Sequence, residues 1–198
     1  MPNSKGLSKD DKRLKSINHL IGREVIYTEK LDGENTSLLT SHIHARSEES
    51  QHHASQGWVK NFHAKIAWTI SEDIQIVGEN MYAKHSIYYD RLTTFFYGFT
   101  AINLKQQCFL SVNATMELFN TLSIKYVPVL YRGVFDPTFK TPNKSSFGDK
   151  IEGYVVRVVD EFPVCESHLN LAKWVRKDHV TTSHNWRRNW TPNKLINK

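Results

Sequence analysis

Residues 29–35 read Glu-Lys-Leu-Asp-Gly-Glu-Asn, and the interpretation of the whole chain starts from this stretch. Residues 24–29, read as EVIYTE, predict a strand, while Asp32 and Gly33 predict a tight turn. Lys30 is therefore expected at the end of a strand, among acidic residues. A lysine acts as a covalent nucleophile only when its amine is neutral, and nearby cations and burial favour that form by lowering its pKa. Taken alone, a lysine beside an Asp-Gly turn is more often a solvated surface residue.

Outward from this stretch, the patterns predict more strands than helices. Strands are expected over 24–29, 36–46, 73–79, 93–99, 126–134, 151–159 and 171–176, and helices over 9–21, 58–70 and 112–122. The helix at 58–70 follows from Trp58, Phe62, Ile66 and Ile70, because a spacing of four residues places them on one helix face. Strands and helices do not alternate as in parallel βαβ units, so the predicted fold class is α+β with antiparallel sheets.

A chain of 198 residues suits one domain. We expect a disordered N-terminus over 1–8, a folded domain over 9–180 and a basic C-terminal tail over 181–198. Residues 173–198 contain seven Lys or Arg and one acidic residue, so the formal net charge of +6 lies in this last part. With Trp186 and Trp190, such a segment suits a polyanion with stackable bases, although a tail that only raises solubility has a similar composition.

Composition also excludes several classes of protein. No apolar run approaches the roughly 20 residues that a membrane-spanning helix needs, and the polar first 15 residues do not resemble a secretory signal. Cys108 and Cys165 cannot form a disulfide framework, so we expect a reducing compartment, the cytoplasm, and no membrane partner. His42 and His44 alternate along one predicted strand, but zinc sites combine tighter Cys and His patterns.

Five further stretches follow the first one in a fixed order. They are Arg46-Ser47, Gly78-Glu79-Asn80, FFYGF at 95–99, EGYVVR at 152–157 and AKWVRK at 172–177. Each has an ordinary interpretation as a strand end, a core aromatic or a solvated edge. Their order resembles the motif series of the covalent nucleotidyltransferases, which are DNA ligases, RNA ligases and mRNA-capping enzymes. The resemblance spans residues 12–179, and the texture around GENMYAKHSIYYDRL and EGYVVRV looks most like the RNA ligases that seal breaks in duplex RNA.

The resemblance implies an antiparallel-sheet nucleotidyltransferase domain of the ligase and capping-enzyme type. It implies that Lys30 attacks the α-phosphate of ATP, with Mg²⁺ or Mn²⁺, and becomes covalently attached to AMP. The AMP would pass to an RNA 5′-phosphate, and an RNA 3′-OH would then displace it, as in RNA repair. The expected partner is RNA with a nick or free ends, and the protein is expected to be a monomer.

The same resemblance assigns roles around the nucleotide. Glu29 would lie near the adenine edge and Phe99 would stack on the purine. Arg46 and Glu79 would hold the ribose hydroxyls, since arginine supplies donors and glutamate supplies acceptors. Asp32 is a further candidate for nucleotide binding.

Other residues are implied to act on the metal and the phosphates. Glu152 would bind the metal, because Mg²⁺ and Mn²⁺ prefer hard oxygen ligands, and Asn35 and Glu79 are further candidates there. Lys173 would contact the α-phosphate, and either Arg176 or Lys177 would supply the second cation of that motif. Lys173 and the metal would also lower the pKa of Lys30.

Two departures from the family pattern stand out. Thr100 follows Phe99 where the family usually carries an acid, which suggests a change behind the purine pocket. About 20 residues follow the last motif, where ligases usually have a further domain before or after the core. A minimal ligase, a basic tail in place of that domain, or a partner protein would each account for this. A minimal DNA ligase, a GTP-using capping-type enzyme and a nucleic-acid-binding protein with an inactive core remain alternatives.

Overall fold

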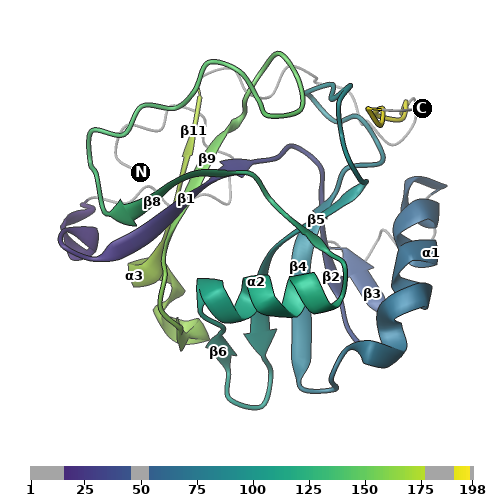
Figure 1. Ribbon diagram of the computed structural model, residues 1–198, viewed down its shortest axis with the longest axis horizontal. Coiled ribbons are helices and arrows are strands. Elements are labelled where there is room, and N and C mark those ends of the chain that lie inside the picture. The colour runs from purple at the N-terminus through teal and green to yellow at the C-terminus, as the bar shows by residue number, and fades with distance from the viewer. Residues whose placement is uncertain (1–15, 46–53, 177–189, 197–198) are drawn as a thin grey trace.

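The computed structural model describes residues 16–45, 54–176 and 190–196, and in these residues the strands form two sheets (Figure 1). The first sheet has the order β11 (Leu171–Val175), β9 (Gly153–Val158), β1 (Glu24–Lys30) and β8 (Val129–Val134), with every neighbour antiparallel. The second has the order β10 (Phe162–Pro163), β6 (Cys108–Phe109), β5 (Phe96–Asn103), β4 (Ile74–Asn80), β2 (Glu34–Leu38) and β3 (Ile43–Ala45). The short strand β7 (Lys125–Tyr126) pairs with β5 in parallel, so the predicted α+β class with antiparallel sheets is confirmed apart from this one pair.

Two helices, α1 (Gly57–Ile66) and α2 (Val112–Thr121), pack against the second sheet. The one-turn helix α3 (Ser167–Asn170) contacts β11 of the first sheet and β10 of the second. The 3₁₀ turns are η1 (Asn18–Leu20), η3 (Ala54–Gln56), η4 (Ala67–Thr69) and η5 (Val164–Glu166). The helix predicted at 112–122 is confirmed as α2. It begins where the Ser111 hydroxyl accepts a hydrogen bond from the Ala114 N–H at 3.2 Å, and it buries Val112, Thr115 and Phe119.

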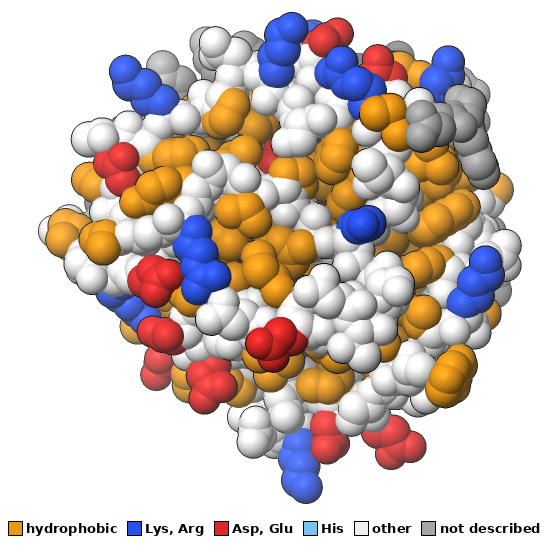
Figure 2. All heavy atoms as spheres, in the orientation of Figure 1, with side chains coloured by type: hydrophobic (Ala, Val, Ile, Leu, Met, Phe, Trp, Pro, Cys, Tyr) orange, Lys and Arg blue, Asp and Glu red, His pale blue; other side chains and the backbone are white. Residues whose placement is uncertain are grey.

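Each sheet has its own apolar core. The first packs Val25, Tyr27, Val156 and Val158 with Phe135, and all five side chains are buried. The second packs Leu38, Ile76, Phe96 and Phe119 beneath α1 and α2. On the face seen in Figure 2, hydrophobic side chains gather near the middle and most charged side chains lie toward the edges.

The chain passes from the first sheet to the second within residues 29–35, the stretch Glu-Lys-Leu-Asp-Gly-Glu-Asn. Strand β1 ends at Lys30 and β2 begins at Glu34, so residues 31–33 form the crossing. Gly33 is needed there, since a Cβ atom would lie 2.6 Å from the Asn80 carbonyl oxygen. Residues 127–128 form a second link between the sheets, from β5 to β1. The Val127 N–H donates to Gly98 O of β5 (3.0 Å), and the Glu29 N–H of β1 donates to Pro128 O (2.8 Å).

Several predicted elements differ from the structure. The helix expected over 58–70 is α-helical only to Ile66 and continues as the 3₁₀ turn η4, and the strand expected over 126–134 is continuous only from Val129, in β8. The strand expected over 36–46 is two strands, β2 and β3, because the Leu39 N–H donates to His42 O at 2.9 Å and closes a turn between them. The strand expected over 93–99 begins only at Phe96 and continues to Asn103. Of the helix expected over 9–21, the described part contains only η1, and the expected disordered segment 1–8 lies outside the described residues.

Residues 190–196 belonged to the expected basic tail, yet they lie against the segment that follows β4. Isolated bridges join Ala83 to Pro192 and Leu92 to Leu195. Leu195 also packs on the buried cluster that contains Met81 and Tyr89. In the described part of the chain, no helix has the length and apolar character that crossing a membrane requires.

The first testable prediction concerns Gly153, which pairs with Lys30 in β1 and with Val175 in β11. A Cβ atom at this position would overlap the carbonyl group of Trp174 in β11. We therefore expect Gly153→Ala to lower the free energy of unfolding by about 3 kcal/mol, because backbone and not a flexible side chain must move. Urea denaturation measures this change.

The control for that substitution is Gly57→Ala, since a Cβ at Gly57 meets nothing within 4 Å. Gly57 lies at the start of α1, so the exchange should leave stability within about 1 kcal/mol or raise it. Equal midpoints for the two variants would contradict the tight contact between β9 and β11.

Candidate active site

A cavity of about 400 Å³ lies where the two sheets meet. Its walls come from β1, the crossing after β1, β2, β4, β5, β9 and β11. The cavity is lined by Thr28, Glu29, Lys30, Leu31, Gly33, Asn35, Glu79, Phe99, Thr100, Tyr126, Val127, Val155, Arg157, Leu171 and Lys173. Six residues predicted for the site, which lie up to 144 positions apart in the sequence, are therefore gathered around one space: Glu29, Lys30, Asn35, Glu79, Phe99 and Lys173.

Lys30 and Glu152 form an ion pair at the edge of this cavity. The Lys30 ammonium donates to both carboxylate oxygens of Glu152, with Nζ 2.6 Å from Oε1 and 2.7 Å from Oε2. The pairing of β1 with β9 sets this geometry, since Lys30 lies opposite Gly153. The Lys30 side chain is 26% exposed and that of Glu152 is 5% exposed, so the lysine is the partner that an entering molecule reaches.

The charges around Lys30 act against its neutral form. Burial by itself would lower the pKa of Lys30, but the carboxylates of Glu152, Glu79 and Asp32 outweigh it and raise that pKa. In the protein without a cation, the acids around the amine therefore raise its pKa, and the lowering expected from Lys173 and a metal stays a prediction. Burial raises the pKa of Glu152, and the ammonium of Lys30 opposes that change.

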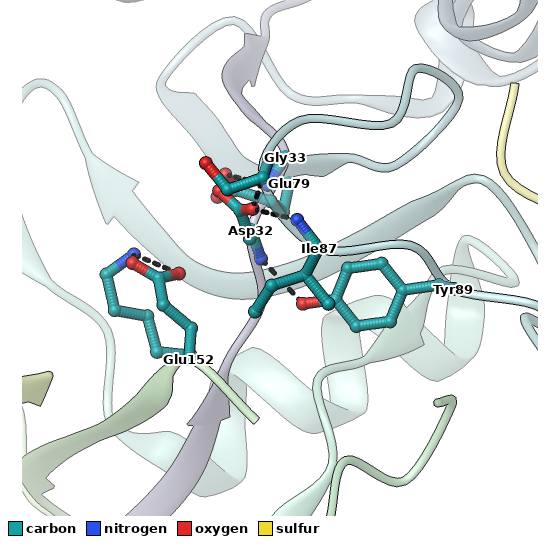
Figure 3. A network of polar contacts seen from close by, with 8 residues as sticks. Asp32, Gly33, Glu79, Ile87, Tyr89 and Glu152 are labelled. Atoms are coloured by element: carbon teal, nitrogen blue, oxygen red, sulfur yellow. Dashed lines mark hydrogen bonds and ion pairs between the residues drawn. The ribbon is translucent and has the colours of Figure 1, made fainter. Parts of the chain in front are cut away.

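Glu79, at the end of β4, is the second carboxylate of the group (Figure 3). One of its oxygens accepts a hydrogen bond from the Gly33 N–H at 3.2 Å. Burial raises the pKa of Glu79 to about 8, Lys30 opposes this, and the charges of Glu152 and Asp32 add to it. Near neutral pH this carboxylate is therefore largely protonated, chiefly because it is buried.

Asp32 is fixed by the loop that follows β4 (Figure 3). Its Oδ2 accepts hydrogen bonds from the N–H groups of Ser86 and Ile87, both at 2.8 Å. The Asp32 N–H in turn donates to the hydroxyl of Tyr89 at 3.0 Å. Both the backbone and the side chain of Asp32 are thus held by one loop.

Glu29 lines the cavity, but its carboxylate is buried and already has partners. The Ser145 hydroxyl donates to Oε1, and the Ser146 N–H donates to Oε2 at 2.9 Å. These bonds tie residues 145–146 to the end of β1. The side chain therefore also organises the protein around the cavity.

Phe99 is the extra residue of a β-bulge. Val77 of β4 pairs with Thr100 and Gly78 pairs with Gly98, so Phe99 has no partner residue on β4. A bulge turns side chains out of the usual alternation, and both Phe99 and Thr100 line the cavity. Behind them the buried Arg157 donates to the Thr100 hydroxyl at 2.9 Å, at the position where the family usually carries an acid.

The remaining predicted residues are placed as follows. Lys173 of β11 lies opposite Val155 of β9 and lines the cavity. Arg46 and Lys177 lie outside the described residues. Arg176 is attached to the site through its backbone, since its N–H donates to the Glu152 carbonyl at 3.0 Å.

Several residues of the site were not predicted from the sequence: Ser86, Ile87, Tyr89, Ser145, Ser146 and Arg157. Ser86, Ile87 and Ser146 act through their backbone N–H groups, which every residue except proline has, so no sequence pattern marks them. The ring of Tyr89 is buried like that of a packing residue, but its hydroxyl accepts a hydrogen bond from the Asp32 N–H. Arg157 carried a weak signal, because its motif was recognised while its side chain was not assigned.

The carboxylates around Lys30 are candidate ligands for a divalent cation. Within the described residues, no three His, Cys, Asp or Glu side chains form a ready-made metal cluster. Mg²⁺ commonly uses only one or two carboxylates together with water and substrate phosphates. Glu79 and Glu152 supply hard oxygen donors, and burial, with the charges of Glu152 and Asp32 added to it, raises the pKa of Glu79. The residues present therefore fit a hydrated, hard cation.

The second prediction follows from Glu79. Its pKa in the folded protein, about 8, lies above its usual value of 4.5. The stability that this group contributes is therefore complete below pH 4.5 and is lost as pH rises through about 8. Glu79→Gln resembles the protonated form, so in EDTA its stability relative to the unmodified protein should increase between pH 5 and pH 9. Urea midpoints across this range measure the difference.

Glu117→Gln is the matched control, because Glu117 is exposed on α2 and the exchange removes the same charge. If the curves of Glu79→Gln and the unmodified protein run parallel from pH 5 to pH 9, the proposed charge crowding at Glu79 is wrong.

Comparison with known proteins supplies the family. A family model described as RNA ligase matches residues 23–175. No curated protein sequence matches the chain. Among solved structures, Naegleria gruberi RNA ligase with PPi is similar with a TM-score of 0.62 and 18% identity, over 86% of this chain and 56% of that one. A mutant of that enzyme with ATP and Mn is similar with a TM-score of 0.61 and 17% identity, over 81% of this chain and 52% of that one.

At such identities these structures establish a shared fold, and the chain spans about half of their length. The family model, in contrast, covers most of the present sequence and includes every motif from the first lysine stretch to the last strand. The chain belongs to the RNA ligase family.

Proposed function

We propose that this chain is an ATP-dependent RNA ligase in which Lys30 becomes covalently attached to AMP. The observation that carries the proposal is the Lys30 amine at the edge of the cavity between the two sheets, in contact with Glu152. A lysine amine with partly open access and a carboxylate at 2.6 Å is suited to nucleophilic attack once it is deprotonated.

In the proposed first step, the Lys30 nitrogen attacks the α-phosphorus of ATP. A phosphorus–nitrogen bond forms, the bond between the α-phosphorus and the bridging oxygen breaks, and pyrophosphate leaves. The amine must lose a proton for this reaction. Glu152, whose carboxylate contacts Nζ, is the nearest acceptor among the described residues.

Divalent cations are part of the proposal, since related structures contain Mn and the carboxylates here fit a hard cation. We propose that Glu152, Glu79 and Asn35 hold Mg²⁺ or Mn²⁺. The cation would neutralise negative charge on the phosphate and among these carboxylates. With that charge compensated, the pKa of Lys30 would fall and more of the neutral amine would be present.

The nucleotide would occupy the cavity. Phe99, turned toward it by the bulge in β5, would stack on the purine, and Lys173 would contact the α-phosphate. Glu29 would lie near the adenine edge and Asp32 beside the nucleotide, while Arg46 and Glu79 would hold the ribose. Lys177 or Arg176 would supply the second cation, and these assignments follow the family pattern.

The later steps use RNA. AMP would pass from Lys30 to an RNA 5′-phosphate, and the 3′-OH of the adjoining strand would then displace AMP and seal the nick. RNA as substrate is supported by the family to which the chain belongs. We propose that the basic segment 181–198 or a partner protein supplies further RNA contacts.

The third prediction tests the covalent step. After incubation with ATP and Mg²⁺ or Mn²⁺, the intact mass of the purified protein should increase by one AMP. Lys30→Ala should abolish the increase, with less than about a thousandth of the labelling, because no other group replaces the nucleophile. Lys105→Ala, an exposed lysine beyond β5, is the matched control and should label normally. A mass increase that persists in Lys30→Ala would identify a different nucleophile.

The protein that carries covalently bound AMP is then used to identify the nucleic-acid substrate. A nicked duplex with RNA on the 3′-OH side should be joined with release of AMP from the protein. The same duplex with DNA at that side is the control. Sealing of the DNA nick alone would assign a DNA ligase, and labelling from GTP in place of ATP would assign a capping-type enzyme.

A further inference from the structure

Residues 190–196, here named the C-terminal strap, run along the loop formed by residues 81–92. The Lys84 N–H donates to Thr191 O at 2.8 Å, and the Lys194 N–H donates to Tyr89 O at 2.9 Å. Further backbone bonds join Asn193 to Tyr82, Leu92 to Lys194, and Ile196 to Leu92, at 2.9–3.1 Å. The C-terminal strap, more than 90 positions away in the sequence, therefore forms backbone hydrogen bonds near both ends of this loop.

Asn193 is the centre of the contact. Its side chain is buried, with 2% of the residue exposed, and it has a partner at each end. Oδ1 accepts from the Tyr89 N–H at 2.9 Å, while Nδ2 donates to Met81 O at 2.7 Å and to Ala83 O at 3.3 Å. One amide thus satisfies three backbone groups of the loop that would otherwise be buried without partners.

The clasped loop is the one that holds Asp32. Tyr89, whose backbone is bound by Asn193, accepts a hydrogen bond from the Asp32 N–H through its hydroxyl. Ser86 and Ile87, between the two points held by Asn193, donate to the Asp32 carboxylate. Asn193 is therefore separated from Asp32 by a single residue, Tyr89, and Asp32 is two positions from Lys30.

We propose that Asn193 is a positioning residue for the reaction at Lys30, and that the C-terminal strap sets the place of Asp32 through the loop 81–92. The inference rests on the proposed function and adds a residue that touches neither nucleotide nor metal. It also gives this part of the basic C-terminal segment a role that does not involve RNA. Small displacements of a positioned group can lower a rate up to about a hundredfold, so a loosened loop should slow the transfer.

A strap that only stabilises the fold makes a different prediction. It would lower the unfolding temperature but leave the rate per folded molecule unchanged below that temperature. A positioning strap lowers the rate of AMP transfer to Lys30 at saturating ATP, even where every variant is fully folded. The two roles are therefore separated by single-turnover rates measured well below each unfolding transition.

The test compares four proteins: Asn193→Ala, Tyr89→Phe, the double variant and Thr191→Ala. Thr191→Ala is the matched control, because Thr191 is exposed and contributes to the loop through its backbone carbonyl. We expect Asn193→Ala to slow lysine adenylylation roughly tenfold at saturating ATP, with a smaller change in KM. Tyr89→Phe removes only the hydroxyl on Asp32 and should slow it by a similar factor. The double variant should be little slower than either single one, since both act on the same contact.

Three outcomes decide the proposal. A normal rate in Asn193→Ala, or factors that multiply in the double variant, would overturn it. If Asn193→Ala does not fold, Leu195→Ala replaces it, because it loosens the same strap while leaving the Asn193 side chain in place. A normal rate in that variant overturns the proposal equally. Failure of the proposed function looks different, since the unmodified protein would then take up no AMP at all.

Discussion

The side chains of Lys30 and Glu152 meet 2.6 Å apart at the point where two sheets come together, and the other features of the site depend on this contact. Lys30 is the last residue of β1, and Glu152 directly precedes β9, the neighbouring strand of the first sheet. The pairing of these two strands therefore sets the separation of the two side chains. The chain then leaves Lys30 for the second sheet within three residues, which brings Asp32 and Glu79 to the same point. The Lys30 ammonium therefore neutralises only part of the negative charge that Glu152, Glu79 and Asp32 place around it.

The excess negative charge around Lys30 determines the protonation of its amine. The carboxylates hold the lysine amine in its charged, unreactive form, and Glu152 and Asp32 add to the rise that burial causes in the pKa of Glu79. Such a site is stable with a cation present and strained by like charges without one. In the proposed ligase, binding of the metal and nucleotide would therefore also be the event that activates Lys30, and the protein alone would keep the amine protonated.

Sequence patterns predicted the parts of this arrangement that are local. The strand ending at Lys30 and the helix α2 were both predicted from short stretches of sequence. The order of the motifs identified Glu79, Glu152, Phe99 and Lys173 as members of one site. The hairpin within 36–46 was missed, since Thr40 and Ser41 are compatible with a strand and only the bond from Leu39 to His42 shows the turn. The bulge that leaves Phe99 without a partner residue on β4 was not predictable either, because it depends on the register between β4 and β5. Likewise, no local pattern relates Tyr89 to Asp32, 57 positions away, or Asn193 to Tyr89, 104 positions away.

The central claim, that neighbouring carboxylates keep the Lys30 amine charged until a cation compensates them, is tested most directly by NMR titration of the lysine ¹³Cε signals, with Lys30→Arg to assign the resonance. In EDTA, the account predicts that Lys30 titrates above its usual value of 10.5, and that Mg²⁺ lowers this pKa. A Lys30 that titrates at or below 10.5 in the absence of metal, or that does not respond to Mg²⁺, would contradict the account.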